Sequence, residues 1–261
     1  MDSVEKLSIV KIGGQILADP NALKSTINAF HKIDGPKILV HGGGKKASAL
    51  SSQMGIAPTM VNGRRITDEK TLDIVTMTYA GLINKKLVAQ MQGLGNNAIG
   101  LSGTDGNLIQ AHKRINASID FGFAGDIDTI NVALLRSLLK LKLSPVICSI
   151  THDKNGQLLN TNADTITNAI ASAMTKLYMV SVYYVFEKKG VLLNVENEDS
   201  LIKEISEKRF AVLKNSKQVH SGMLPKLENA FDALKKGVKQ IKIGQHQIIS
   251  NAYAGTKVIS A

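Results

Sequence analysis

Short apolar runs alternate with helical patterns along nearly the whole chain, and this alternation limits the possible folds more than any other feature. The apolar runs LSIVKI, PKILVH, AIGLSG, LSPVICSI, LYMVSVYYVF and VKQIKIG have the length of buried strands. Helical spacing appears between them, as in NADTITNAIASAM and PKLENAFDALKKG. Strands that alternate with helices form mainly parallel sheets covered on both faces. The pattern therefore predicts an α/β fold, a three-layer αβα sandwich around a mainly parallel open sheet.

The longest predicted helix covers residues 67–93. Its apolar residues recur at helical spacing and predict the side that faces the core. Two acidic residues suit its first turn, and two lysines lie well toward its end. By contrast, FGFAGDIDTIN and THDKNGQLLN have the composition of loops or hairpins. The predicted core residues of the helix are Leu72, Val75, Tyr79, Leu82, Leu87 and Met91.

The 261 residues suffice for one large domain or two lobes, and 44% of them are hydrophobic, which excludes disorder. We place the lobe boundary after residue 174, with lobes 1–174 and 175–261. No apolar run reaches the ~18 residues of a membrane span, and no secretory signal is apparent. Cys148 is the one cysteine, so no disulfide can form within the chain. These features predict a cytoplasmic protein without a membrane partner.

The formal net charge of +11 fits nucleic acid, small anionic substrates or a merely solvated surface. Aromatic residues make up 4% and tryptophan is absent, so few stacking platforms for bases exist. The lysines are spread along the chain rather than gathered in one basic arm. The composition therefore argues against a nucleic-acid partner.

Two features point to an anionic ligand. Lys11 lies inside the first predicted strand, and burying an ammonium group is costly unless an anion meets it. Gly42, Gly43 and Gly44 join a strand to a helix; glycines let the backbone approach an anion, and a helix N-terminus offers free N–H groups. The same glycines fit a Rossmann-like pattern only weakly, since no acidic residue follows at the expected offset. No P-loop motif is present.

Three further stretches carry polar residues in unusual positions. Arg65, in NGRRITDE, suits a bidentate carboxylate contact, or alternatively an ion pair with the acidic residues that follow it. Asn160, Asn162 and Asp164 begin a predicted helix, where capping needs one of them. Lys226 lies in a first helical turn, where the helix dipole favours acids. Lysines, a glycine turn and an aspartate in this arrangement fit phosphoryl transfer, which depends on charge stabilisation.

Taken together, the stretches VKIGG, VHGGG, NGRRITD, LSGTDGNLIQA, NTNAD and SGMLPKLENA resemble the amino acid kinase family in kind and in order. The resemblance implies an enzyme that transfers the γ-phosphate of ATP to a carboxylate. It is closest to members that act on an N-acylated glutamate, with N-acetyl-L-glutamate as the default substrate and N-succinyl-L-glutamate as the alternative. Another amino acid kinase, or a non-catalytic sensor with this fold, is a less favoured interpretation.

The resemblance also implies roles for individual residues. Lys11 and Lys226 would contact the transferring phosphoryl group, and Asp164 would hold both lysines in place. The backbone of Gly43 and Gly44, with Arg65 and Asn160, would bind the acylated amino acid in the first lobe. The second lobe would bind the nucleotide, and the residues implied for the nucleotide site are Gly13, Gly14, Glu187, Gly190, Val191, Leu192, Gln218 and His220.

No cluster of protein ligands for a metal is evident, so Mg²⁺ is expected on the phosphates of ATP and on water. A homodimer is expected, because family members usually pair through the region of the 67–92 helix. One departure is the stretch VFEKKGV, where Glu187 and two lysines replace the family's usual residues. This departure affects the expected adenine-side contacts more than the chemistry.

Overall fold

The computed structural model describes residues 4–61, 64–116, 118–216 and 223–260. The chain forms two compact units, which we call unit 1 (residues 1–37 and 167–261) and unit 2 (residues 38–166). The first 37 residues thus belong with the C-terminal part, unlike in the expected division into 1–174 and 175–261. The reason is strand pairing: β1 (Lys6–Ile12) pairs in parallel with β11 (Met179–Val185) along its whole length.

The strands of unit 1 follow the order β12–β14–β13–β11–β1. Strand β13 (Gln240–Gly244) is parallel to β11, and β14 (Thr256–Ile259) is antiparallel to β13. Strand β12 (Glu204–Ser206) pairs in parallel with β14. The expected mainly parallel α/β architecture is confirmed. Fully buried apolar residues of β1, β11 and β13 form the core of the unit, among them Leu7, Ile9, Val180, Val182, Ile241 and Ile243, whereas Met179 at the start of β11 is 37% exposed.

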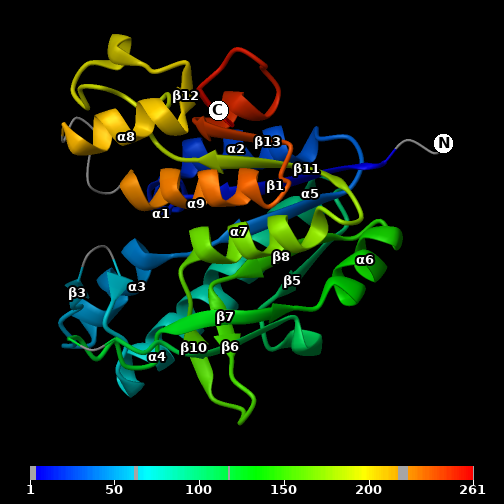
Figure 1. The fold of residues 1–261 in the computed structure, drawn as a ribbon. Coiled ribbons are helices and arrows are strands. Elements are labelled where there is room, and N and C mark those ends of the chain that lie inside the picture. Colours follow the sequence, from blue (N-terminus) through cyan, green and yellow to red (C-terminus); the bar gives the residue numbers. More distant parts are fainter. Residues whose placement is uncertain (1–3, 62–63, 117, 217–222, 261) are drawn as a thin grey trace. The chain divides into compact units, whose positions relative to one another are not determined.

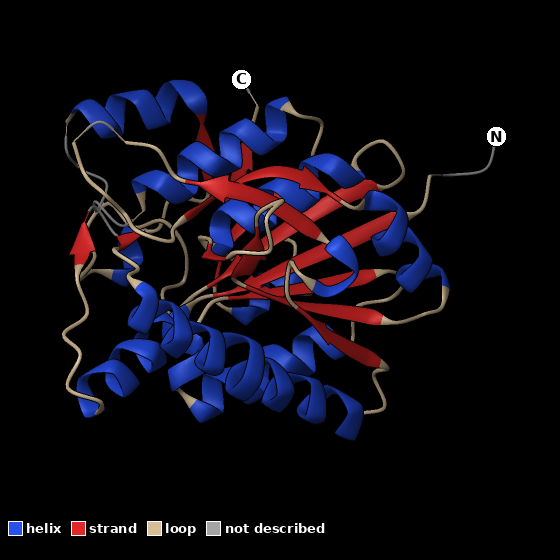
Figure 2. Ribbon diagram, turned by 90° about the horizontal axis from the view of Figure 1, so that it is seen from below, coloured by secondary structure: helices blue, strands red, loops and turns tan. Residues whose placement is uncertain are grey.

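Helices lie against these strands (Figures 1 and 2). They are α1 (Gly14–Ala18), α2 (Pro20–His31), α8 (Glu207–Asn215) and α9 (Leu224–Lys235), with 3₁₀ turns at Glu198–Ser200 and His246–Ile249. Asp19 caps α2 by accepting from the backbone N–H groups of Asn21 and Ala22. At the other end, the Lys37 ammonium donates to the carbonyls of His31 and Ile33. Both ends of α2 are thus satisfied by side chains.

Unit 2 contains the parallel strands β2 (Lys37–His41), β8 (Ser144–Cys148) and β5 (Ala98–Leu101). A four-stranded sheet has the order β10–β9–β6–β7, from Leu158–Asn160, Ile150–His152, Ile109–Lys113 and Gly125–Ile130. The stretches with loop or hairpin composition form β7 and the β9–β10 hairpin of this sheet. A short hairpin joins β3 (Met60–Val61) to β4 (Arg64–Arg65). The remaining elements are α3 (Gly44–Gln53), a 3₁₀ turn (Asp105–Asn107), α6 (Val132–Lys140) and α7 (Ala163–Met174), within which the division between the units falls.

The predicted long helix forms, but its middle is a π-helix. It consists of α4 (Glu69–Thr76), π-helical Met77–Ile83, and α5 (Asn84–Gly93). Hydrogen bonds from i to i+5 add a residue to the turn and rotate the helix face. Leu82, predicted as a core residue from α-helical spacing, is therefore 40% exposed, whereas Ile83 is 6% exposed. The other predicted core residues of this helix are buried.

Parallel pairing brings the carboxyl ends of several strands to one edge within each unit. In unit 2, the glycine loop follows β2, Ser149 follows β8 and Ser102 follows β5. In unit 1, Lys11 lies near the carboxyl end of β1, and Glu187 comes just after β11. Open α/β sheets bind their ligands outside the carboxyl ends of the strands. Each unit is therefore expected to bind its ligand at the carboxyl ends of these strands.

Candidate active site

The loop Gly42–Gly44 joins β2 to α3, as the glycine pattern predicted. A Cβ atom on Gly43 would come within 2.8 Å of the Tyr79 ring and still closer to Cδ1 of Ile83. Real Cβ atoms do not approach other heavy atoms so closely, so this position has room for glycine alone. Gly44 opens α3, whose first N–H groups have no partner inside the helix. The backbone of this loop can therefore approach and bind an anion.

Arg65 is the buried cation beside this loop. Its guanidinium donates through Nη2 to the Gly44 carbonyl at 3.0 Å and to Oγ of Ser48 at 2.7 Å. The side chain is 7% exposed, and its buried Nη1 has no hydrogen-bond partner among the described residues. The alternative of an ion pair with Asp68 is not realised, since Asp68 instead caps α4 by accepting from the Thr71 N–H. A buried guanidinium with a spare donor fits a carboxylate ligand.

Thr67 connects Arg65 to Asn160. The Asn160 amide donates to Oγ1 of Thr67 at 3.0 Å, and that hydroxyl donates to the Arg65 carbonyl at 3.3 Å. Unit 2 therefore brings together Gly44, Arg65 and Asn160, three residues predicted for substrate binding. Thr67 itself is fully buried and was missed, because a single threonine in the sequence gives no signal of this role.

At the start of α7, Asn162 and Asp164 have different roles. Asn162 caps the helix, since its side-chain oxygen accepts from the backbone N–H groups of Asp164 at 2.8 Å and Thr165 at 3.2 Å. One residue thus suffices for capping, as expected. Asp164 is 8% exposed and lies in the first turn of the helix. A carboxylate so placed is suited to holding cationic groups.

The predicted lysines both belong to unit 1. Lys11 is 7% exposed although it lies in a strand, which matches the prediction of a buried ammonium group. Gly13 follows the strand and donates its N–H to the Val185 carbonyl at 2.9 Å, and Gly14 opens α1. Lys226 lies in the first turn of α9. Their roles in phosphoryl transfer stay a prediction.

The residues predicted for nucleotide binding divide into several groups. Glu187 is exposed, and its carbonyl accepts from the Gln245 amide at 2.9 Å. Val191 and Leu192 have buried side chains, so they support the segment from the core. Gly190 packs against Thr256, whose Oγ1 a Cβ would approach to 2.6 Å. Gln218 and His220 lie outside the described residues.

The two lysines of the VFEKKGV departure make local contacts. The Lys188 ammonium donates to the Val195 carbonyl at 3.2 Å, and the Lys189 ammonium pairs with Glu198 at 2.7 Å. Both contacts fall within the segment that follows β11. These contacts of the two lysines are therefore local to the segment in which they occur.

Sequence reasoning also missed a buried polar pair behind the glycine loop. His41 and Asn84 are 0% and 1% exposed and hydrogen-bond to each other at 3.0 Å. Burial lowers the pKa of His41 to about 4, against a smaller opposing effect of its bond to the Gly42 carbonyl. Burial likewise raises the pKa of the Tyr79 hydroxyl, and the charge of Arg65 opposes this. With its pKa lowered to about 4, the His41 imidazole is neutral at neutral pH.

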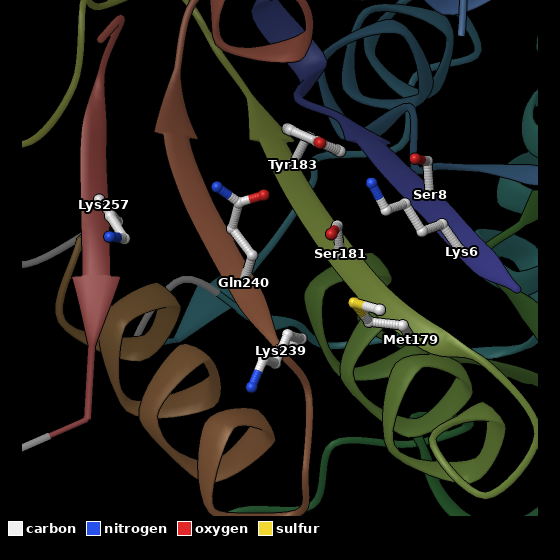
Figure 3. A pocket seen from close by; sticks show the side chains of 8 residues that line it. All are labelled: Lys6, Ser8, Met179, Ser181, Tyr183, Lys239, Gln240 and Lys257. Carbon is white, nitrogen blue, oxygen red and sulfur yellow. The ribbon is translucent and has the colours of Figure 1, made fainter. Parts of the chain in front are cut away.

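A pocket of about 400 Å³ opens elsewhere on unit 1 (Figure 3). It lies where β1 and β11 begin, and Lys6 and Ser8 precede Lys11 on the same strand. Because ligands bind at the carboxyl ends of such strands, this pocket is distinct from the candidate active site. None of the predicted site residues lines it; the lining residues are Lys6, Ser8, Met179, Ser181, Tyr183, Lys239, Gln240 and Lys257.

Among the described residues, no group of three histidine, cysteine or acidic side chains could hold a metal ion. No helix in the described ranges is long and apolar enough to cross a membrane. Cys148 is buried and reduced, and burial raises the pKa of its thiol to about 12.

Comparisons with known proteins identify the family of the chain. Residues 6–245 match the amino acid kinase family. The chain is 47% identical over 255 residues to acetylglutamate kinase of Parabacteroides distasonis, covering 98% of this chain and 100% of that one. A Streptococcus mutans protein of known structure has a TM-score of 0.82 at 24% identity, covering 97% and 98% of the two chains. Carbamate kinase of Giardia lamblia bound to AMP-PNP has a TM-score of 0.70 at 15% identity, covering 98% and 99%.

The family match and the similarity to curated kinases identify a phosphoryl-transferring α/β enzyme. The chain belongs to the amino acid kinase family and is a kinase, so the predicted resemblance is confirmed. The two solved structures support the fold alone. The acetylglutamate kinases to which it is similar extend over nearly its whole length.

Replacing Gly43 or Gly42 with alanine should lower the stability of the protein by different amounts. We expect Gly43→Ala to lower the free energy of unfolding by about 1–3 kcal/mol, because its methyl group overlaps the Tyr79 ring. Gly42→Ala is the matched control, since its Cβ would make ordinary contacts at 3.6 and 3.7 Å and should cost less than about 1 kcal/mol. Urea denaturation of both variants measures the difference. Equal losses would contradict the close packing of Gly43.

Proposed function

We propose that this kinase uses ATP to phosphorylate the γ-carboxylate of N-acetyl-L-glutamate, giving N-acetylglutamyl 5-phosphate and ADP in arginine biosynthesis. The observation that carries the proposal is the buried Arg65 guanidinium, which holds a spare donor beside the glycine loop. An α-carboxylate is the natural partner of such a fork. The similarity to acetylglutamate kinases supports this choice of substrate.

The chemistry needs no general base. A γ-carboxylate has a pKa of ~4.3 and is already a nucleophile at neutral pH. One of its oxygens attacks the γ-phosphorus of ATP; the bond from that phosphorus to the β–γ bridging oxygen breaks, and ADP leaves with the electron pair. What the reaction requires is relief of repulsion between anions. We assign this to Lys11 and Lys226, with Asp164 holding both ammonium groups in place.

The acylated amino acid and the nucleotide would bind to different parts of the chain. The backbone N–H groups of Gly43 and Gly44, with Arg65 and Asn160, would hold the acylated amino acid. Mg²⁺ would be held by the nucleotide phosphates and water, and when bound it supplies further neutralisation of phosphate charge. The residues that we assign to the nucleotide are Gly13, Gly14, Glu187, Gly190, Val191, Leu192, Gln218 and His220.

The surroundings of the basic residues near the loop favour an acetyl over a succinyl group. A succinyl carboxylate would need a cation, and the candidates from the sequence are Lys45, Lys46 and Arg64. Lys45 and Lys46 are exposed to solvent. Arg64 is half-buried near Arg114 and Asp126, and burial with the Arg114 charge lowers the pKa of its guanidinium while Asp126 opposes this. A neutral acetyl group needs none of them.

We also propose a cytoplasmic homodimer that pairs through the long helix. Part of this helix presents apolar and small residues to solvent: Met77 is 52% exposed, Leu82 is 40% exposed, and nothing lies within 4 Å of a Cβ built on Gly81. The rotation that the π-helix imposes brings Leu82 to this surface. Small and apolar residues together allow a second helix to approach closely.

A coupled assay of ADP release tests the proposed substrate. We expect ADP release with N-acetylglutamate, a lower kcat/KM with N-succinylglutamate, and no turnover with aspartate or UMP. The physical reason is the unpartnered Nη1 of Arg65, which suits one α-carboxylate beside a neutral acyl group. A preference for the succinyl substrate would select the alternative acyl group. Turnover of aspartate or UMP in place of acylglutamates would overturn the assignment.

Replacing either lysine tests the proposed charge stabilisation. We expect Lys11→Met and Lys226→Met each to lower kcat by ~10²–10³-fold, because losing one preorganised charge contact has this effect. The KM for N-acetylglutamate should change much less, since the charge develops during transfer. Lys6→Met is the control, being an exposed lysine on the same strand as Lys11. A near-normal kcat in Lys11→Met or Lys226→Met would remove that lysine from the mechanism.

A further inference from the structure

His41, the last residue of β2, makes two hydrogen bonds from a fully buried position. Its Nδ1 lies 2.8 Å from the carbonyl oxygen of Gly42, and its Nε2 lies 3.0 Å from Nδ2 of Asn84. The residue leads directly into the glycine loop. Nothing in the mechanism above uses this imidazole, so its burial calls for a physical explanation.

The backbone determines which ring nitrogen carries the proton. Nδ2 of Asn84 also lies 2.9 Å from the Val146 carbonyl, which can only accept. The amide therefore donates one hydrogen to Val146 and the other to Nε2 of His41, which must be unprotonated. The proton is on Nδ1, which donates to the Gly42 carbonyl. The carbonyls of Gly42 and Val146 thus fix the neutral His41 tautomer that is protonated on Nδ1.

The π-helix delivers Asn84 to this position. Residues five apart share a face where the hydrogen bonds run from i to i+5, so Tyr79 and Asn84 both face β2 and its loop. Tyr79 packs on Gly43, and Asn84 reaches His41. The amide oxygen of Asn84 sits where a Cβ on Gly100 would overlap it, so glycine at position 100 leaves room for the side chain. π-helical turns occur often at functional sites.

The hydrogen bond to Gly42 controls a peptide plane of the loop. In a planar trans peptide the carbonyl oxygen and the following N–H point in opposite directions, and no peptide in the described ranges is cis. Holding the Gly42 oxygen toward His41 therefore turns the Gly43 N–H the other way. No acceptor in the described part of the chain pairs with that N–H.

We propose that His41, held by Asn84, is a positioning residue that fixes the Gly42–Gly43 peptide so that the Gly43 N–H donates to the acylated amino acid. The inference rests on the proposed function and adds a residue pair that supports its substrate site. The imidazole stays neutral and transfers no proton. Its part is to remove the freedom that three consecutive glycines would otherwise give the loop.

Two substitutions at His41 distinguish the hydrogen bond made by Nδ1 from the hydrogen bond made by Nε2. In His41→Asn the side-chain amide has a nitrogen as many bonds from Cβ as Nδ1, so it can still donate to the Gly42 carbonyl. In His41→Gln the amide extends instead to the place of Nε2 and faces Asn84. We expect His41→Gln to raise the KM for N-acetylglutamate at least 10-fold with the KM for ATP within 2-fold, and His41→Asn to stay within about 3-fold for both.

The melting temperature of each variant controls for packing. A merely structural role would instead lower the apparent kcat of both variants in step with lost stability, and would leave both KM values unchanged or raise them together. Equal KM values for N-acetylglutamate in His41→Asn and His41→Gln would therefore overturn the proposal, as would an ATP effect as large as the acylglutamate effect. Because both variants lose the same imidazole, the comparison stays informative when each is less stable than the wild type.

A second measurement does not depend on catalysis. Long-range ¹H–¹⁵N NMR of protein labelled with ¹⁵N-histidine reports the tautomer of each imidazole, and the signal absent from His41→Asn identifies His41. We expect the neutral form protonated on Nδ1 at pH 7. A proton on Nε2, or a charged ring, would contradict the hydrogen-bond arrangement. If the tautomer is as expected and wild-type protein does not phosphorylate N-acetylglutamate, the proposed function fails and the geometry stands.

Discussion

The packing of the long helix against Gly43 is the contact on which the candidate site depends. A side chain at this position would collide with Tyr79 and Ile83, so the loop can lie on the helix only as bare backbone. The same contact places Asn84 behind the loop and brings Tyr79 next to the guanidinium of Arg65. A backbone held this closely has its N–H groups and its neighbouring cation in fixed positions. Electrostatic stabilisation by fixed groups needs no reorganisation during the reaction.

Buried positive charge is the second constraint, and it links stability to ligand binding. Lys11 and Arg65 are each 7% exposed. Burial of a cation is unfavourable unless hydrogen bonds or an anion compensate for it. Arg65 is partly compensated by Gly44 and Ser48, and its buried Nη1 has no partner among the described residues. The protein therefore keeps positive charge where an anionic substrate would bind, at a cost that the substrate offsets.

The sequence was most informative where a residue conflicted with its local surroundings. A lysine in an apolar strand, three glycines in a row and an arginine before a helix all conflict with simple packing. Arg65 and the loop lie together in the structure as such conflicts suggest. Residues that agree with their surroundings gave no signal. Thr67 and Asn84 are ordinary residues in the sequence, and their roles follow from contacts with residues far away along the chain.

Two structural features were beyond prediction from spacing. The π-helix places Ile83 in the core where α-helical spacing predicted Leu82. The prediction failed because α-helical periodicity assumes a constant number of residues per turn. The pairing of β1 with β11 joins residues more than a hundred positions apart and places the N-terminal strand with the C-terminal part. Long-range strand pairing is set by tertiary packing, which local patterns do not contain. The predicted nucleotide residues Gln218 and His220 lie outside the described residues.

The most direct test of the account is to trap the product of the reaction with hydroxylamine. An acyl phosphate reacts with hydroxylamine to give a hydroxamate, whereas ATP hydrolysis and phosphorylation of a hydroxyl group do not. With N-acetylglutamate, ATP and Mg²⁺, the account predicts one hydroxamate for each ADP formed, and neither product without N-acetylglutamate. ADP release without hydroxamate would show that the phosphoryl group does not go to a carboxylate, and would contradict the central claim.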